Sequence, residues 1–358
     1  HLRRPLTMKI LDWYIIRKFL GTYVFAIFLI LAITVMFDIN EKLDAFLKAP
    51  LKATVFDYFL NFLPYFANQF SPLFTFIAVI FFTSKLADNS EIIAMLSTGM
   101  SYRRLLRPYL ISATVIAALT YVLSAYIIPP ANVKRIDYTN TYVKNKRVDY
   151  GTNIQLQVAK GEIAYMSRYD NLQKTGYKFS LERFDGKTLV SRLTAQSIRW
   201  DTLHQWTVRD YMIRDFEGQN EKIRRGNRLD TIIPIEPRDF LISKNDQEML
   251  TSPALTEYID RQKERGVANI KSFEIEKHRR YAMTAAAFIL TVIGMSLSSK
   301  KVKGGMGVNI GIGLVLSFSY ILFMTVTSTF AVSGYTSPMI AMWIPNILYT
   351  FIAIYLYY

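Results

Sequence analysis

The sequence contains no cysteine and only three histidines among its 358 residues. The lack of cysteine excludes disulfide bonds, thiolate chemistry, and zinc or iron–sulfur centres held by cysteine. His204 and His278 have no companion at metal-ligand spacing, so we interpret each as a surface or structural histidine. Charged residues make up only 20% of the chain, apolar residues reach 51%, and the net charge is +15. These proportions exclude a plain soluble enzyme, a disordered chain and a disulfide-stapled secreted domain.

The signatures of nucleotide and hydrolytic chemistry are missing as well. The segment Gly304-Gly305-Met306-Gly307 is rich in glycine, but it lacks the lysine and the preceding strand of a phosphate-binding loop, which favours a turn. Neither Gly-x-Ser-x-Gly nor His-Glu-x-x-His occurs. We therefore predict that the chain is not an enzyme and has no catalytic residue, no metal site and no cofactor.

Long uncharged apolar blocks dominate the rest of the sequence. The hydrocarbon core of a bilayer is about 30 Å thick, and a helix needs roughly 20 apolar residues to cross it. The blocks that reach this length are residues 19–37, 58–84, 108–130, 281–299, 306–332 and 338–358. We predict an α-helical membrane protein with six transmembrane helices in a 3+3 arrangement, and we leave residues 1–7 out of this interpretation.

Lysine and arginine in the short loops predict the orientation of the spans. They gather before the first block, between the second and third, and between the fourth and fifth, as Arg17, Arg103 and Lys300 illustrate. Because these segments fall on one side of the membrane, that side is predicted to be the cytoplasm. Both termini are then cytoplasmic, and residues 131–280 are extracytoplasmic.

Residues 131–250 have the pattern of a separate all-β domain. The strand candidates are residues 153–158, 177–182, 205–216 and 230–235. Asp185-Gly186 is a typical turn between two strands. Several short strands at near-regular spacing predict an antiparallel sandwich or an open barrel. A helical return is expected over residues 251–280, starting at Thr251-Ser252-Pro253.

The loop after the second span is predicted to hold a short amphipathic helix at about residues 90–99. Ser90 is the expected N-cap, and Gly99 is the expected end of the helix. The apolar face has two equally supported interpretations: it lies on the lipid surface, or it docks on a cytoplasmic partner. The residues that would form this site are Ser90, Glu91, Ile92, Met95, Leu96 and Gly99.

Basic residues also flank the extracytoplasmic ends of the spans, against the general charge trend. They are Lys42, Lys48, Lys52, Lys134, Arg135, Arg279 and Arg280. One interpretation is that they solvate the membrane interface. The other is that they form a ring of cations for a phosphorylated lipid head group. Asp38, Glu41 and Asp44 dilute the positive charge around the first three of these lysines.

Several motifs resemble those of the lipopolysaccharide-export permeases, LptF and LptG. They are Leu11-Asp12-Trp13-Tyr14-Ile15 before the first span, Ser90-Glu91 with Met95 and Gly99 in the loop after the second, and Met306-Gly307-Val308 at the fifth. The order of three spans, an outside β domain and three spans is also similar. The start of the first span favours LptG, whereas Met342-Trp343 and Asn346 resemble LptF, so the paralogue LptF stays an alternative.

The resemblance implies a permease subunit of an ABC exporter in the inner membrane of a Gram-negative bacterium. A paralogous permease and a cytosolic LptB-like ATPase dimer would be its partners, with residues 90–99 as the coupling helix and Glu91 as its polar contact. The β domain would be a periplasmic jellyroll that passes lipopolysaccharide to an LptC/LptA-like bridge. The basic residues near the first span, Lys42 and Lys48 first among them, would meet the phosphates of the lipid.

Two other classes of function remain open. One is a membrane scaffold that docks partners without transport activity. The other is an ion-coupled carrier, but the six apolar blocks contain no Asp, Glu, Lys or Arg, which such carriers usually keep at mid-membrane. The expected division is a first membrane part over residues 1–130, the β domain over 131–250, the helical return over 251–280 and a second membrane part over 281–358.

Overall fold

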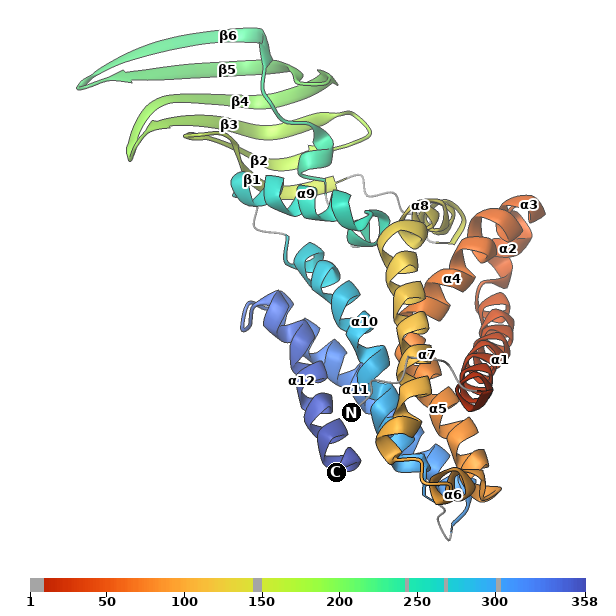
Figure 1. The fold of residues 1–358 in the computed structure, drawn as a ribbon. Coiled ribbons are helices and arrows are strands. Elements are labelled where there is room, and N and C mark those ends of the chain that lie inside the picture. The colour runs from red at the N-terminus through yellow and green to blue at the C-terminus, as the bar shows by residue number, and fades with distance from the viewer. Residues whose placement is uncertain (1–9, 144–149, 242–244, 267–269, 301–303) are drawn as a thin grey trace. The chain divides into compact units, whose positions relative to one another are not determined.

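The computed structural model describes residues 10–143, 150–241, 245–266, 270–300 and 304–358. They form two compact units. The helical unit comprises His1–Lys144 and Glu274–Tyr358, and the β unit comprises Asn145–Phe273. Figure 1 shows helices in the first unit and a single curved sheet with one longer helix in the second.

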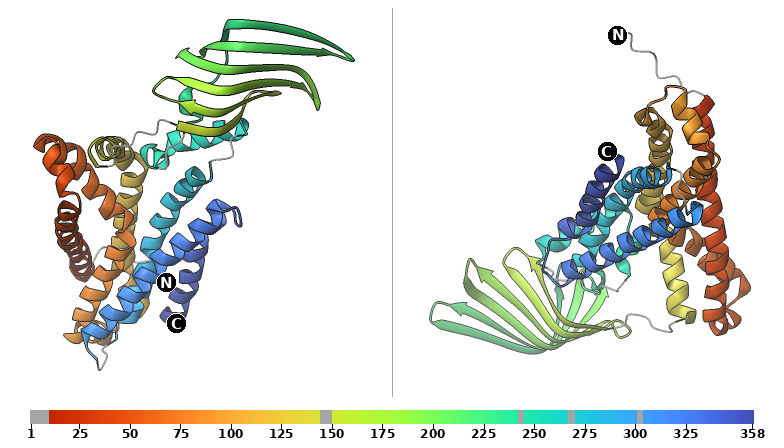
Figure 2. Two further views of the ribbon diagram at one scale, coloured as in Figure 1. Left: turned by 180° about the vertical axis from the view of Figure 1, so that it is seen from behind. Right: turned by 90° about the horizontal axis from the view of Figure 1, so that it is seen from below.

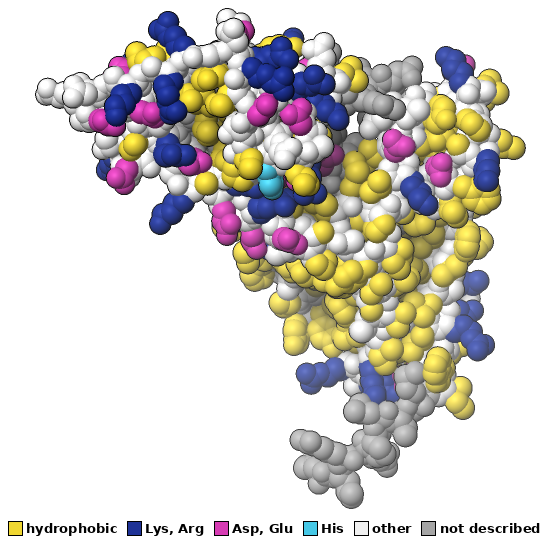
Figure 3. Space-filling view, turned by 90° about the horizontal axis from the view of Figure 1, so that it is seen from above, with side chains coloured by type: hydrophobic (Ala, Val, Ile, Leu, Met, Phe, Trp, Pro, Cys, Tyr) yellow, Lys and Arg dark blue, Asp and Glu magenta, His cyan; other side chains and the backbone are white. Residues whose placement is uncertain are grey.

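Six helices among the described residues are long and apolar enough to span a membrane. They are α1 (Ile10–Glu41), α5 (Ser71–Asp88), the continuous helix Tyr102–Val143, α10 (Lys271–Ser298), α11 (Met306–Val332) and α12 (Pro338–Tyr357). In the view of Figure 3, hydrophobic side chains cover the helical unit, whereas charged side chains gather on the β unit. The predicted fold class, a six-span helical membrane protein with an inserted β domain, is confirmed.

Two helical stretches differ from the apolar blocks in the sequence. The stretch before α5 consists of α2 (Leu43–Lys48), α3 (Leu51–Ala53), η1 (Thr54–Phe59) and α4 (Leu60–Gln69). The backbone leaves the helical conformation at Phe70, with φ −100° and ψ 15°, just ahead of Pro72. This break divides the second apolar block, because proline restricts the residues before it and removes a helical donor.

The third helix continues beyond its apolar block. It consists of α7 (Tyr102–Val122), η2 (Leu123–Ile127), α8 (Ile128–Tyr138) and η3 (Thr139–Val143). Pro129 and Pro130 do not end it, and a local change to π-helical bonding is one way in which membrane helices accommodate proline. The π-helical segment η2 immediately precedes α8, which contains both prolines.

Contacts between distant residues define two ends of the helical unit. The start of α7 meets the start of α1 through Arg104 and Asp12, and the ring of Tyr102 lies 5.5 Å from that of Tyr357 in α12. We call this the terminal end, because α1 begins and α12 ends there (Figure 1). The opposite end, where the chain leaves for the β unit and returns from it, is the insert end.

Two glycines allow α10 and α11 to approach α5 closely. A Cβ atom on Gly294 of α10 would lie 2.8 Å from Cγ1 of Val79. A Cβ atom on Gly313 of α11 would collide with Cδ1 of Ile80. Small residues at such positions let membrane helices pack backbone to backbone. The second half of the membrane unit is therefore held against α5 by contacts that larger side chains would prevent.

Gly294→Val is expected to destabilise the helical unit by about 1–3 kcal/mol, the usual cost of overpacking a tight interface. Gly311→Val is the matched control, because Gly311 lies in α11 with no atom within 4 Å of its would-be Cβ. The measurement is the apparent midpoint of thermal unfolding in detergent micelles. Equal midpoints for the two variants would contradict close packing of α10 on α5.

The β unit contains one six-stranded antiparallel sheet in the order β1-β2-β3-β4-β5-β6. The strands are β1 (Tyr150–Ala159), β2 (Glu162–Asp170), β3 (Thr175–Asp185), β4 (Thr188–Thr202), β5 (Gln205–Glu217) and β6 (Asn220–Ile232). Each strand pairs with its neighbour in sequence, and Figure 2 shows the sheet strongly curved. The described strands therefore form an antiparallel meander, in which each strand pairs with the next one along the chain.

Alternation of side chains gives this sheet its core. Ile154, Leu156 and Val158 of β1 are buried, as their period-two spacing predicts. The predicted turn at Asp185-Gly186 joins β3 to β4, and Gly186 adopts φ +62°, which glycine tolerates at little cost. Strands β2 and β4 were not among the predicted strands, and the strand predicted at residues 230–235 corresponds to the end of β6, which runs from Asn220 to Ile232.

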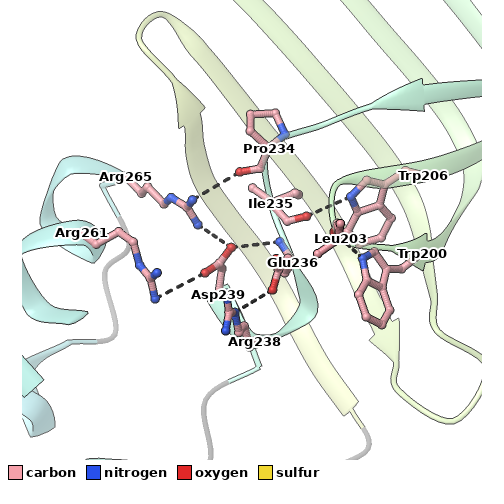
Figure 4. A network of polar contacts seen from close by, with 10 residues as sticks. All are labelled: Trp200, Leu203, Trp206, Pro234, Ile235, Glu236, Arg238, Asp239, Arg261 and Arg265. Carbon is pink, nitrogen blue, oxygen red and sulfur yellow. Dashed lines mark hydrogen bonds and ion pairs between the residues drawn. The ribbon is translucent and has the colours of Figure 1, made fainter. Parts of the chain in front are cut away.

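A buried carboxylate joins the segment after β6 to helix α9 (Ser252–Glu264) (Figure 4). Asp239, in the short helix η4 (Pro237–Asp239), forms ion pairs with Arg265 at 2.6 Å and Arg261 at 3.8 Å. It also accepts the backbone N–H of Glu236 at 2.9 Å. Burial, reinforced by the nearby acids Asp246 and Asp239, raises the pKa of Tyr258 in α9 to about 12, so this phenol stays protonated at neutral pH.

Candidate functional site

The predicted amphipathic helix at the terminal end is α6 (Glu91–Ser97). Its start differs from the predicted N-cap: Ser90 adopts the left-handed conformation, with φ 60°, and its side chain makes no capping hydrogen bond. Its end follows the prediction, since Gly99 has φ +89°, a conformation that favours glycine. The turn from α5 into α6 is therefore shaped by a backbone reversal at Ser90.

The apolar face of α6 is buried within the chain itself. Ile92 is 2% exposed and Met95 is 9% exposed. Both belong to a core cluster with Ile15 of α1 and Leu105 of α7, and half-buried Leu96 packs against the same cluster. Neither predicted occupant, lipid or a cytoplasmic protein, covers this face, because the membrane helices already do.

Two polar contacts fasten this region to the start of α1. Arg104 donates two hydrogen bonds to the carboxylate of Asp12, both at 2.7 Å, and the Asp12 residue is only 3% exposed. The Tyr14 hydroxyl donates to the Glu91 carboxylate at 3.3 Å. Bidentate pairing fixes distance and orientation together. The start of α1 is thus bonded to α7 through Arg104 and to α6 through Glu91.

The opposite face of α6 is open to solvent. Ile93 is 57% exposed and is the large apolar side chain on this face. The exposed residues on and beside this face are Asn89, Ser90, Ile93, Ala94, Ser97, Thr98 and Gly99. We call this set the α6 outer face. It is the surface of α6 that a separate protein can contact.

At the insert end, four of the seven predicted lipid-binding cations are engaged within the chain. Lys42 pairs with Asp38 at 2.9 Å and donates to the Tyr58 hydroxyl at 2.6 Å. Arg135 stacks on the ring of Tyr65 at 4.0 Å. An anion would have to displace these partners to reach either charge.

Arg279 and Arg280 share one acidic partner, Glu276 of α10. The ion-pair distances are 2.7 Å and 3.1 Å, and the Arg280 side chain is only 3% exposed. Arg280 is therefore placed inside the helical unit, away from any surface that a head group could reach. Burial paired with a carboxylate indicates a structural role for this arginine.

Lys48, Lys52 and Lys134 are different, because each is exposed. Lys48 ends α2, Lys52 lies in α3, and Lys134 lies in α8. None of the three forms an ion pair with another residue in the described ranges. They are the predicted cations that remain available to an anionic ligand.

Comparison with known protein families identifies the family of this chain. The family described as lipopolysaccharide export system permease LptF/LptG matches residues 13–358. The chain belongs to this family. Membership of this family, together with the six apolar helices, makes the chain a multi-pass protein of the bacterial inner membrane. It is a subunit of a lipopolysaccharide export system with a partner permease and other Lpt components. A search among curated proteins finds no significant match.

Four residues outside the predicted site set also contribute to the contacts around α6. Arg104 and Ile93 lie beside the predicted motif, and Asp12 and Tyr14 lie in the motif before the first span. Asp12 is the only acidic residue ahead of the first apolar block, among several basic residues, and this was the available signal that it has a basic partner. Nothing in the sequence indicated that this partner lies 92 positions away.

Proposed function

We propose that this chain is the LptG-like permease of an ABC exporter that extracts lipopolysaccharide from the inner membrane. A separate cytosolic ATPase powers the step, and a periplasmic bridge receives the lipid. The observation that carries the proposal is the family match over residues 13–358. The residues Leu11-Asp12-Trp13-Tyr14-Ile15 at the start of α1 favour LptG over LptF.

The α6 outer face is the proposed docking surface for the ATPase. It combines exposed Ile93 with small residues that permit close approach, and the buried face of α6 ties it to the core. The proposed orientation puts the terminal end in the cytoplasm. Arg103 and Arg107 at this end agree with the excess of basic residues on the cytoplasmic side of membrane proteins.

The proposed lipid-phosphate contacts are Lys48, Lys52 and Lys134 at the insert end. Their exposure leaves their ammonium groups available for charge-assisted contacts with phosphate. Lys42 and Arg135 are secondary candidates, because binding must first break Lys42–Asp38 or unstack Arg135 from Tyr65. Arg279 and Arg280 are proposed to act on Glu276 and not on the lipid.

A photo-crosslinking amino acid at position 48 is expected to label lipopolysaccharide in the complex reconstituted with the partner permease and the ATPase. The same amino acid at position 280 is the matched control, and it should give little or no labelling because Arg280 is buried. Addition of ATP should reduce labelling at position 48 as the lipid leaves for the bridge protein. The readout is the crosslinked adduct on a gel, detected with antibody against lipopolysaccharide.

Labelling of phospholipid alone at position 48 would contradict the proposed lipid contact. A chain that binds the ATPase but supports no ATP-dependent release of lipopolysaccharide would be a scaffold and not a permease. Release driven by an ion gradient without ATP would indicate a carrier.

A further inference from the structure

Two adjacent grooves lie at the terminal end, between α7, α10 and α12. The first has a volume of about 460 Å³, and Arg103 and Arg107 of α7 line it. The second has a volume of about 290 Å³. Leu106, Tyr357 and Tyr358 line both, so the grooves are neighbours that share a wall.

The two arginines are available charges on an otherwise paired stretch of helix. Arg104, between them in sequence, is neutralised by Asp12. Arg103 and Arg107 form no hydrogen bond or ion pair with any residue that the structure describes. They are four positions apart on α7, so they project from the same side of the helix. No acidic residue lines either groove within the described ranges.

Away from the arginines, the grooves are apolar. The first continues past Leu110 and Ile111, and the second is lined by Phe288, Val292 and Ile354. Phe288 precedes the end of α10 at Ser298 by ten residues, which corresponds to about 15 Å along the helix. One leaflet of a bilayer core has about this thickness. The two arginines thus lie at one end of the grooves, and the apolar lining extends from them over a distance similar to the length of an acyl chain.

We propose that these grooves bind one anionic phospholipid of the leaflet at the terminal end, with its phosphate on Arg103 and Arg107 and its acyl chains along α10 and α12. The tyrosines at the rim, Tyr357 and Tyr358, suit the head-group level, where aromatic side chains with a polar tip concentrate in membrane proteins. The inference needs only the membrane assignment, and it is independent of the direction and substrate of transport.

A phospholipid fits this place better than a protein does. The wall formed by Phe288, Val292 and Ile354 lies within membrane-spanning helices, at a depth where lipid is the surrounding solvent. A soluble partner could reach the arginines but not this wall. Free phosphate would satisfy the arginines and leave the wall without an occupant, so the experiment must separate the head group from the chains.

The test is lipid retention by the full chain, purified in a mild detergent and titrated with phosphatidylglycerol, phosphatidylcholine or inorganic phosphate. Native mass spectrometry measures bound lipid. Phosphatidylglycerol is expected to bind in preference to phosphatidylcholine. Arg103→Gln/Arg107→Gln should weaken phosphatidylglycerol binding about 25-fold, since each basic side chain near an anionic lipid contributes about fivefold.

Arg17→Gln/Lys85→Gln is the matched control, because it removes two exposed charges of the same end that line neither groove. It should leave binding unchanged. Ile354→Trp fills the second groove at an exposed position and should also weaken binding, while leaving the unfolding midpoint unchanged. Equal loss in the control variant, equal binding of phosphatidylcholine, or competition by millimolar phosphate would overturn the proposal. The proposal would also be overturned if Arg103→Gln/Arg107→Gln kept its lipid binding but recovered less ATPase in a co-purification, because the two arginines would then contact a protein.

Discussion

Replacing Arg104 by alanine is expected to lower the thermal unfolding midpoint of this permease by about 5–10 °C, which corresponds to roughly 3 kcal/mol. The unfolding midpoint falls because Asp12, the partner of Arg104, remains buried in the variant. Asp12 is only 3% exposed, and the Arg104 guanidinium donates two hydrogen bonds to its carboxylate, both at 2.7 Å. Without Arg104 the buried carboxylate loses a bidentate, charge-assisted contact, and removing one partner of a buried pair costs more than the pair contributes.

The neighbouring residue provides the control for this prediction. Arg103→Ala removes the same side chain from an exposed position with no described partner, so its midpoint in micelles free of anionic lipid should match that of the unmodified chain. Asp12→Ala/Arg104→Ala removes both charges and should recover a large part of the loss. If Arg104→Ala unfolds at the unmodified temperature, the ion pair does not hold α1 against α7.

Ile93→Arg is expected to abolish association with the ATPase while leaving the fold intact. Ile93 is 57% exposed on the α6 outer face, so arginine is tolerated in the free subunit. In a complex the same charge would be buried without a partner, and co-purification should fall by about tenfold or more. The measurement is the amount of ATPase recovered with a tagged permease, normalised to the permease.

Leu47→Arg is the matched control, because Leu47 is also exposed, at 75%, but lies in α2 at the insert end. It should leave ATPase recovery unchanged. Full recovery with Ile93→Arg would remove the α6 outer face as the docking surface. Changes at Ile92 or Met95 are uninformative here, since both side chains belong to the core of the membrane unit.

Ile92 and Ile93 show which features of α6 helical spacing predicts and which it does not. Helical spacing correctly grouped Ile92 with Met95 on one face and predicted that this face is buried. It did not indicate what covers the face, because that depends on α1 and α7, which are distant in sequence. The functional consequence is reversed: the face proposed for docking is the one with fewer apolar residues.

The seven basic residues at the insert end also differ in ways that the sequence did not indicate. All seven look alike in sequence, but Lys42 closes a contact with Asp38 and Tyr58, and Arg280 is enclosed beside Glu276. Lys48, in contrast, is exposed. A side chain is available to a ligand only when no internal partner holds it, and internal partners are set by the packing of helices.

Six spans, an inserted β domain and the family were all predictable from the amino-acid sequence, because each depends on local composition, local periodicity or short motifs. A run of about 20 apolar residues must form a helix in a bilayer, since no water is present to satisfy its backbone. The folded arrangement was needed to find the Arg104 partner of Asp12, the meander order of the sheet and the open face of α6. Each of these depends on contacts between segments far apart in the chain, and residue order along the chain does not specify them individually.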